Sequence, residues 1–306
     1  MIRSILVPLD GSPGAERALP WGAGLARATG AEIHLVTVHV ARSLYHRLSP
    51  LGGDVVEARV REGEEAYLER QAADVGGELG AEPKVALLTG APGTALCRHV
   101  TRRGIDIIVM STHGYGGFQR AWLGSVTDAV IRRARVPVLV VPQAAEDAHP
   151  RAVPEPGSAR ILVAVDGSVE SEVALAWAWP LCTALSADCT VIRVVVPPSH
   201  VIASSIEYTG ELNAEMQQAA EAEAETYLQR VLETAPSPAG NVRAEVVTAQ
   251  SAAHGILRSA EESDADIIVI GTRGHGGATR LLLGSVADKV VRGSRVPVLV
   301  CPPPST

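Results

Sequence analysis

The chain has 306 residues, a length that fits two domains of ordinary size. Apolar residues make up 46% of it but phenylalanine occurs once, so buried cores have to be built from Val, Ile, Leu and Ala, as in α/β proteins. A net charge of −7 argues against a protein that binds nucleic acid by general electrostatic attraction.

Cysteine usage and the start of the chain indicate a cytoplasmic protein. The cysteines show neither CxxC nor zinc spacing, which predicts small buried side chains in a reducing compartment. They are Cys97, Cys182, Cys189 and Cys301. Met1 leads directly into the apolar run Ile5-Leu6-Val7 without a signal peptide. No apolar run reaches the roughly 18 residues of a membrane span, so we expect no membrane partner.

The first half alternates short apolar runs with helical patterns. Ser12 suits a helix N-cap and Pro13 a first helical turn, while Gly30 and the pair Gly76-Gly77 are typical helix ends. Strands are expected at about 5–7, 33–40, 85–88, 105–110 and 136–141, and helices at 13–29, 54–75, 92–103 and 125–134. This alternation predicts a parallel sheet with helices on both faces.

The second half repeats the first. Residues 143–159, rich in Pro and Ala, read as a linker between domains at 1–143 and 159–306. Segment 160–168 mirrors 4–12. Further strands are expected at 189–196, 244–247, 266–270 and 296–300, with a long polar helix at 211–234. The offset between corresponding residues of the two halves grows from 156 to 160 along the chain. The two halves are therefore expected to have the same fold, with a short insertion in the second.

A glycine-rich loop follows the fourth strand in each half. GTRGHGGATRLLLGS, residues 271–285, has the spacing Gly-x2-Gly-x9-Gly-Ser, and STHGYGGFQRAWLGS occupies 111–125. The order strand, glycine loop, helix start suits anion binding, because the first N–H groups of a helix lack partners and glycine lets a phosphate approach. For the central glycines, a purely structural role in the turn is an equal alternative.

An aspartate ends the first strand of each half. If strands one and four flank the point where strand order reverses, Asp10 meets the first glycine loop and Asp166 the second. A carboxylate there suits a ribose diol rather than a phosphate. The alternative is that Asp-Gly-Ser only forms a turn. We expect Ser125 and Ser285 to act both as N-caps and as phosphate ligands, and the histidines outside the loops to be structural or solvated.

These residues together resemble the universal stress protein family, in its tandem two-domain form. The resemblance covers nearly all of both halves and is based on the strand ending in Asp-Gly-Ser, the Gly-x2-Gly-x9-Gly-Ser loop and the closing Val-Pro-Val-Leu-Val. It implies an α/β fold of two tandem five-stranded parallel sheets of order 3-2-1-4-5, the adenine nucleotide hydrolase-like fold. It also implies that ATP binds, with Mg²⁺ as a plausible companion ion. Members commonly dimerise through their last strands, so we expect an internal pseudo-dimer or a homodimer.

The resemblance also transfers binding positions onto this chain. In the second half the adenosine pocket would use Ala164, Val165, Asp166 and Val196, with Ile270 lining the cleft, and the phosphate site would use Gly271, Arg273, Gly274, Gly284, Ser285 and Val286. The matching positions of the first half are Pro8, Leu9, Asp10, Val40, Met110, Ser111, His113, Gly114, Gly124, Ser125 and Val126.

Ser111 departs from the motif, which has glycine at that position. If the position needs a positive φ, serine costs roughly 1–2 kcal/mol and weakens the first site about tenfold. If φ is negative, serine costs nothing.

We expect an ATP-binding regulator of stress or growth state with little or no hydrolysis. The loops lack the lysine of a P-loop NTPase, and Leu9-Asp10-Gly11-Ser12 is not the loop of an ATP pyrophosphatase. Asp128 and Asp288 recur in the first turn of the fourth helix, where acids are ordinary partners of the helix dipole. The alternatives are a slow ATPase and a scaffold that binds no nucleotide. No catalytic residues and no dedicated metal ligands are expected.

Overall fold

The computed structural model describes residues 2–40, 53–112, 123–143, 153–197, 210–235, 240–272 and 283–303. The chain forms two compact units, Met1–Val153 and Pro154–Thr306. None of the helices that the structure describes combines the length and apolar character that a membrane span requires.

Strands and helices alternate through the described part of the first unit. In chain order they are β1 Ser4–Pro8, α1 Pro13–Glu16, α2 Leu19–Thr29, β2 Glu32–His39, α4 Gly53–Leu79, β3 Lys84–Thr89, α5 Pro92–Arg103, β4 Ile107–Ser111, α6 Ser125–Arg133 and β5 Val138–Val141.

The second unit repeats this order. Its described elements are β6 Arg160–Val165, α7 Val169–Leu185, β7 Asp188–Val195, α9 Gly210–Glu233, β8 Val242–Thr248, α10 Ala252–Glu262, β9 Ile267–Gly271, α11 Ser285–Gly293 and β10 Val298–Cys301.

Within each unit the strands are parallel and follow the order 3-2-1-4-5. The first sheet runs β3-β2-β1-β4-β5 and the second β8-β7-β6-β9-β10. The predicted α/β class with tandem parallel sheets is confirmed. The chain moves outward from the first strand and then returns to its other side, so strand order reverses between β1 and β4 and between β6 and β9.

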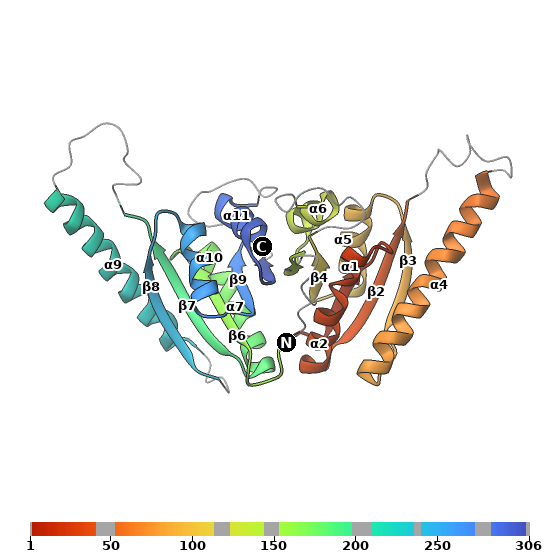
Figure 1. Cartoon of the computed structure of the whole chain (residues 1–306), viewed down its shortest axis with the longest axis horizontal. Helices are drawn as coiled ribbons and strands as arrows, with labels where there is room; N and C mark the ends of the chain where they lie inside the picture. The colour runs from red at the N-terminus through yellow and green to blue at the C-terminus, as the bar shows by residue number, and fades with distance from the viewer. Residues whose placement is uncertain are drawn as a thin grey trace. The chain divides into compact units, whose positions relative to one another are not determined.

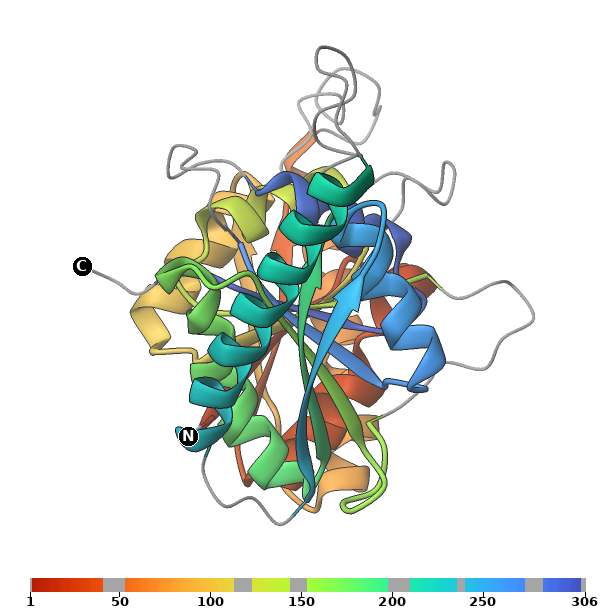
Figure 2. The same cartoon turned by 90° about the vertical axis from the view of Figure 1, so that its left-hand side faces the viewer.

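Helices cover both faces of each sheet. Figure 1 shows α4 and α5 on opposite sides of β3, and α9 and α10 on opposite sides of β8. In Figure 2, α9 crosses in front of β7 and β8. The central strands are buried along most of their length, with Ile5, Leu6 and Val163 no more than 1% exposed. Burial on both faces explains why these strands are continuous apolar runs without alternation.

Two helix boundaries differ from the sequence prediction. The helix expected at 13–29 is two helices, α1 and α2, because Pro20 has no N–H to donate to the carbonyl four residues earlier. The helix expected to end at Gly76-Gly77 continues to Leu79. It ends where Gly80 takes φ +65° and donates its N–H to the Gly76 carbonyl over 2.9 Å.

One residue of the expected linker is part of the first unit. Val153 packs against Gly24 of α2, so closely that a Cβ added to Gly24 would lie 2.6 Å from the Val153 Cβ. The first unit therefore extends into the stretch that composition alone marks as a linker.

Candidate functional site

The carboxyl ends of the strands that flank the order reversal lie side by side in each unit. Leu6 of β1 is paired with Ile108 of β4. In the second unit, Ala164 of β6 is paired with Ile270 of β9. Because the strands are parallel, the aspartate after each first strand and the glycine loop after each fourth strand leave the sheet at one edge. We call these two places the carboxyl edges.

A tight turn follows β1 at the first carboxyl edge. Asp10 Oδ1 accepts the backbone N–H of Ser12 over 3.0 Å and its hydroxyl over 2.6 Å. Gly11 between them has φ +80°, which glycine adopts without strain. Ser12 caps α1 by accepting the Ala15 N–H over 3.1 Å. Asp-Gly-Ser therefore forms a turn, as the alternative interpretation expected. The predicted ribose contact would have to use the same Asp10 carboxylate that holds this turn.

The second carboxyl edge has the same turn at the same distances. Asp166 Oδ1 accepts the N–H and hydroxyl of Ser168 over 3.0 and 2.6 Å, and Gly167 has φ +87°. Ser168 caps α7 by accepting the Ser171 N–H over 3.1 Å. Ser171 in turn accepts the Asp166 N–H over 3.2 Å. Both aspartates are therefore held in a fixed turn.

Each glycine loop is closed at its base by a backbone hydrogen bond. Gly124 N–H donates to the Thr112 carbonyl over 2.8 Å, and Gly284 N–H donates to the Thr272 carbonyl over the same distance. The predicted phosphate positions His113, Gly114, Arg273 and Gly274 fall outside the described residues. The described ends of both loops thus meet the sheet in matching ways.

The prediction that Ser125 and Ser285 are N-caps is wrong. The caps are Gly124 and Gly284, whose backbones are extended at φ −58° and −60°, and the serines are the first residues of α6 and α11. Both serines are exposed, and their hydroxyls make no hydrogen bond within the described part of the chain. First-turn N–H groups have no carbonyl partner inside the helix. Each hydroxyl therefore lies beside donors that suit an anion.

The other predicted positions form the apolar surroundings of these groups. Half-buried or buried residues are Pro8, Leu9, Met110, Val126, Ala164, Val165, Val196, Ile270 and Val286. Val40 is 45% exposed, directly after β2. Leu9 is fixed by its N–H, which donates to the Val36 carbonyl over 2.8 Å. These residues can offer an apolar surface to a base, next to the polar turn.

The structure decides between the two alternatives for Ser111. Ser111 and Gly271 are both strand residues, paired with Val141 and Cys301, and neither has a positive φ. Serine at this position therefore carries no backbone penalty. The first unit adds one bond here, because the Thr127 hydroxyl donates to the Ser111 carbonyl over 2.9 Å.

Sequence reasoning missed a tyrosine that lies near a glutamate in each unit. In the first unit the Tyr67 hydroxyl of α4 donates to Glu16 Oε1 over 3.0 Å. In the second unit burial, and then the nearby Glu172 carboxylate, raise the pKa of Tyr227. The tyrosines stand 160 residues apart on the two polar helices, so the repeat offset was the signal that could have found them.

An arginine distinguishes the second carboxyl edge. The Arg193 guanidinium stacks 5.3 Å from the Tyr227 ring centroid and pairs with Glu223 over 3.1 Å. It lies so close to the turn that a Cβ added to Gly167 would be 3.3 Å from Arg193 Cζ. The corresponding residue of the first unit is Thr37, so no repeat signal pointed to it.

The histidines that the structure describes on β2 and α5 are packed or paired. His39 is buried, with Glu64 2.8 Å from Nδ1 and Glu57 3.5 Å from Nε2. His34 and His99 stack edge to face with ring centroids 6.1 Å apart. In the described ranges, no three His, Cys, Asp or Glu side chains are grouped to hold a metal ion.

The described groups of each carboxyl edge combine hydrogen-bond donors, a carboxylate and an apolar surface. The exposed serine hydroxyl and the first-turn N–H groups suit phosphate oxygens, the aspartate suits a sugar diol, and the strand ends suit a base. The nearest helix acids are already paired: Asp128 with Arg132 over 2.8 Å and Asp288 with Arg292 over 2.9 Å. The edge therefore has donors for an anion, while the acids of α6 and α11 are held by their own arginines.

Comparison with known proteins gives a consistent result. The model of the universal stress protein family matches residues 1–142 and again 158–302. A universal stress protein of Mycobacterium tuberculosis is 28% identical over 302 residues, covering 97% of this chain and 96% of that protein. A universal stress protein of Bacillus subtilis is 32% identical over 150 residues, covering 46% of this chain and 99% of that protein.

Solved structures share the fold over the full length. The crystal structure of a universal stress protein from Archaeoglobus fulgidus has a TM-score of 0.67 and 23% identity, covering 99% of this chain and 97% of that one. A structure described as a putative universal stress protein from Pseudomonas aeruginosa has a TM-score of 0.64 and 20% identity, covering 99% of this chain and 94% of that one.

Proposed function

Because the chain belongs to the universal stress protein family, we propose that it is an ATP-binding member that acts as a nucleotide-dependent regulator in the cytoplasm. The observation that supports this most is that the two units repeat the same local geometry. The aspartate turn has the same two distances at both carboxyl edges, and each edge also has an exposed serine at the start of a helix.

Under this proposal each described group has a definite role. Asp10 and Asp166 accept the ribose hydroxyls with the carboxylate that also orders the turn. Ser125 and Ser285 donate to phosphate oxygens together with the first-turn N–H groups of α6 and α11. Leu9 and Val40, and their counterparts Val165 and Val196, line the base. Mg²⁺ would accompany the phosphates as a charge partner.

We expect ATP to be held rather than consumed. The acids nearest the helix starts, Asp128 and Asp288, are engaged by arginines, which disfavours a role as general base for an attacking water. The competing functions are a slow ATPase and a scaffold that binds no nucleotide. A measurement of the ATP hydrolysis rate distinguishes the ATPase from the regulator. If pure protein hydrolysed several ATP molecules each second, the proposal of a regulator that holds ATP would be contradicted.

The nucleotide carried through purification tests the proposal directly. Freshly purified chain is denatured by heat, and the released small molecules are separated by anion-exchange chromatography and compared with the protein concentration. We expect adenine nucleotide, with up to two molecules per chain. If the protein releases no nucleotide and gives no heat of binding on titration with ATP and Mg²⁺, it is a scaffold that does not bind nucleotide.

A further inference from the structure

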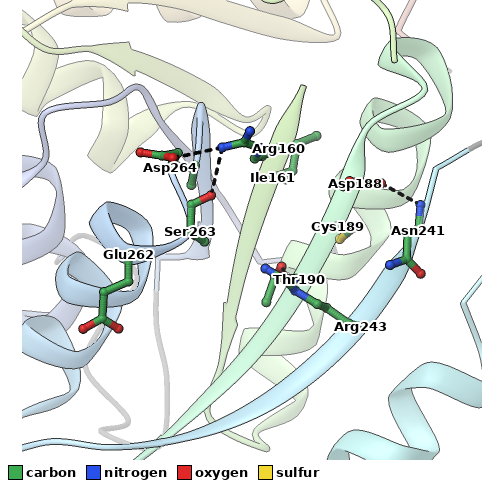
Figure 3. Close-up of a pocket in the computed structure, with 11 residues that line it drawn as sticks. Arg160, Ile161, Asp188, Cys189, Thr190, Asn241, Arg243, Glu262, Ser263 and Asp264 are labelled. Carbon is green, nitrogen blue, oxygen red and sulfur yellow. Dashed lines mark hydrogen bonds and ion pairs between the residues drawn. The ribbon is translucent and has the colours of Figure 1, made fainter. Parts of the chain in front are cut away.

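A cleft lies at the opposite edge of the second sheet, where its strands begin. It has a volume of about 290 Å³ and is bounded by the starts of β6, β7 and β8 and by the turn after α10. Figure 3 shows the residues around it. Asp166 follows the carboxyl end of β6, and Ser285 begins α11 after the loop that follows β9, so this cleft is separate from the proposed nucleotide site. We call it the amino-edge cleft.

The two sides of the amino-edge cleft have different chemistry. Figure 3 shows Thr190, Asn241 and Arg243 on the side of β7 and β8, and Glu262 and Asp264 on the side of α10. Buried Ile161, Cys189 and Ala265 also line the cleft, each at most 2% exposed. The side of β7 and β8 thus offers a guanidinium and an amide beside the Asp188 carboxylate, and the side of α10 offers two further carboxylates.

Arg243 has hydrogen-bonding capacity that the described residues do not use. Its Nε donates to the Thr190 hydroxyl over 2.9 Å, which fixes the guanidinium plane. No described carboxylate pairs with its Nη groups, although Asp188 lines the same cleft. Asp188 Oδ1 is instead occupied by the Asn241 N–H over 2.9 Å. A guanidinium fork held in this way is suited to a carboxylate from outside the chain.

The first unit uses the same position differently. Lys84 is opposite His34 on its sheet, as Arg243 is opposite Thr190. Glu32, one methylene longer than its counterpart Asp188, reaches Lys84 over 2.5 Å and His34 over 2.8 Å. His99, which stacks on His34, corresponds to the much smaller Ser259. In the first unit Lys84 is therefore neutralised and two buried imidazoles pack together, whereas in the second unit no described carboxylate pairs with the Arg243 guanidinium.

The charges around the amino-edge cleft indicate what kind of ligand it accepts. The cleft is lined by two arginines, Arg160 and Arg243, and by three acids, Asp188, Glu262 and Asp264, and this excess of acids disfavours a simple anion. Arg160 is paired with Asp264 over 3.2 Å, and Glu262 lies 3.6 Å from Arg258, beyond hydrogen-bonding distance. A ligand that brings a carboxylate to Arg243 needs a positive group toward the α10 side to avoid repulsion.

We propose that the amino-edge cleft of the second unit binds a small zwitterion, with its carboxylate on the Arg243 fork and its ammonium group facing Glu262 and Asp264. The acids are 67% and 84% exposed, so water screens them and binding is weak, with specificity resulting from the pairing of opposite charges at the correct separation.

A series of amino acids of increasing length tests this on the full chain. Glycine, γ-aminobutyrate and ε-aminocaproate are titrated while the arginine side-chain N–H resonances are followed by NMR, with caproate and hexylamine as singly charged controls. We expect one member of the series to shift the Arg243 resonance and to bind at least about tenfold more tightly than either singly charged control.

Variants decide whether the cleft is responsible. Arg243→Gln should weaken the best zwitterion about tenfold, Arg243→Lys should weaken it less, and Lys84→Gln in the first unit should change nothing. Glu262→Gln combined with Asp264→Asn should weaken the zwitterion but not caproate. The proposal is overturned if caproate binds as tightly as the zwitterion, if Arg243→Gln leaves binding unchanged, or if no member moves the Arg243 resonance at saturating concentration.

Discussion

The carboxyl edges and the amino edges of the two sheets have diverged to very different extents. At the carboxyl edges, Asp10 and Asp166 bind their serines at identical distances, and the loop bases close at the same 2.8 Å. At the amino edges, Glu32 connects Lys84 and His34, while Asp188 leaves Arg243 without a carboxylate partner among the described residues.

This difference is informative because both edges belong to the same repeated fold. Sheet packing alone requires neither edge to keep its polar groups, since both lie where strands meet solvent. Polar geometry that is the same in both halves points to one shared task, and polar geometry that differs points to separate tasks. The first half is therefore expected to bind the same nucleotide as the second, and the amino-edge cleft to belong to the second half alone.

The largest expected effect on ATP binding comes from placing a carboxylate at the first residue of α6 or α11. Ser285→Glu should weaken ATP binding to the second unit by about 100-fold or more, because a phosphate would face a negative side chain instead of a hydroxyl donor. An acid suits a first helical turn, so the fold should persist. Calorimetric titration should report about one ATP per chain instead of two.

The matched variant in the other half sharpens this result. Ser125→Glu should remove the first site in the same way, and the double variant should bind no ATP. If either single variant abolishes all binding, the two carboxyl edges are not equivalent sites, and if neither changes the stoichiometry, the serines are not phosphate ligands. Circular dichroism of each variant controls for loss of helix.

A smaller effect is expected when each turn aspartate becomes asparagine. Asn keeps an oxygen that can accept from Ser168 or Ser12, so the turn should be retained, but it loses the charge that strengthens bonds to sugar hydroxyls. Asp166→Asn should weaken ATP about tenfold at the second site while affecting deoxyadenosine triphosphate much less. Equal losses for both nucleotides would assign the aspartate to the turn only.

The sheet order and the aspartate turns were predicted by different routes. The order came from the resemblance, whereas Asp-Gly-Ser and the closing Gly-Ser of the loop each occur twice at a near-constant offset. Ser125 was misassigned as a cap, because Gly124 with an extended backbone can serve as N-cap without offering a side-chain bond. Composition cannot distinguish a cap from the first helical residue when both suit the position.

Other features could not be predicted because they depend on side chains that meet only after folding. Arg193 reaches the turn at Gly167 from a neighbouring strand, and Glu32 joins two strands through His34 and Lys84. Neither contact has a spacing signature along the chain. Gly76 was expected to end a helix, but a glycine that keeps helical dihedrals is tolerated, at a cost of about 1 kcal/mol.

The histidine pair of the first amino edge should make stability depend on pH in that half. Burial, and then the positive charges of His34, Arg103 and Arg102, lower the pKa of His99. The folded state therefore favours neutral His99. As the pH falls below about 6.5, the ordinary pKa of a histidine, the unfolded chain takes up the proton first. The stabilisation is present above that pH and is lost below it.

Denaturant unfolding at about pH 7.5 and about pH 5.5 measures this loss, which for one proton is at most about 1.4 kcal/mol per pH unit. His99→Ser, which introduces the residue found at position 259, should be less stable at the higher pH and should show a flatter pH dependence. The exposed His254→Ser should leave the slope unchanged. A slope that His99→Ser does not alter would place the acid sensitivity elsewhere.

The smallest effect is expected from exchanging the residues that differ at the ends of β4 and β9. Both positions are in strands with negative φ, so Gly271→Ser should leave ATP affinity within about twofold and stabilise the chain slightly, since glycine is unfavourable in a strand by roughly 0.5–1 kcal/mol. Ser111→Gly should cost a similar amount of unfolding free energy without changing the first site, because Thr127 bonds to the backbone carbonyl. Calorimetric titration and denaturant unfolding of both variants check this. A tenfold change in affinity at either site would show that the serine side chain takes part in binding, and the two carboxyl edges would then differ in function as well as in sequence.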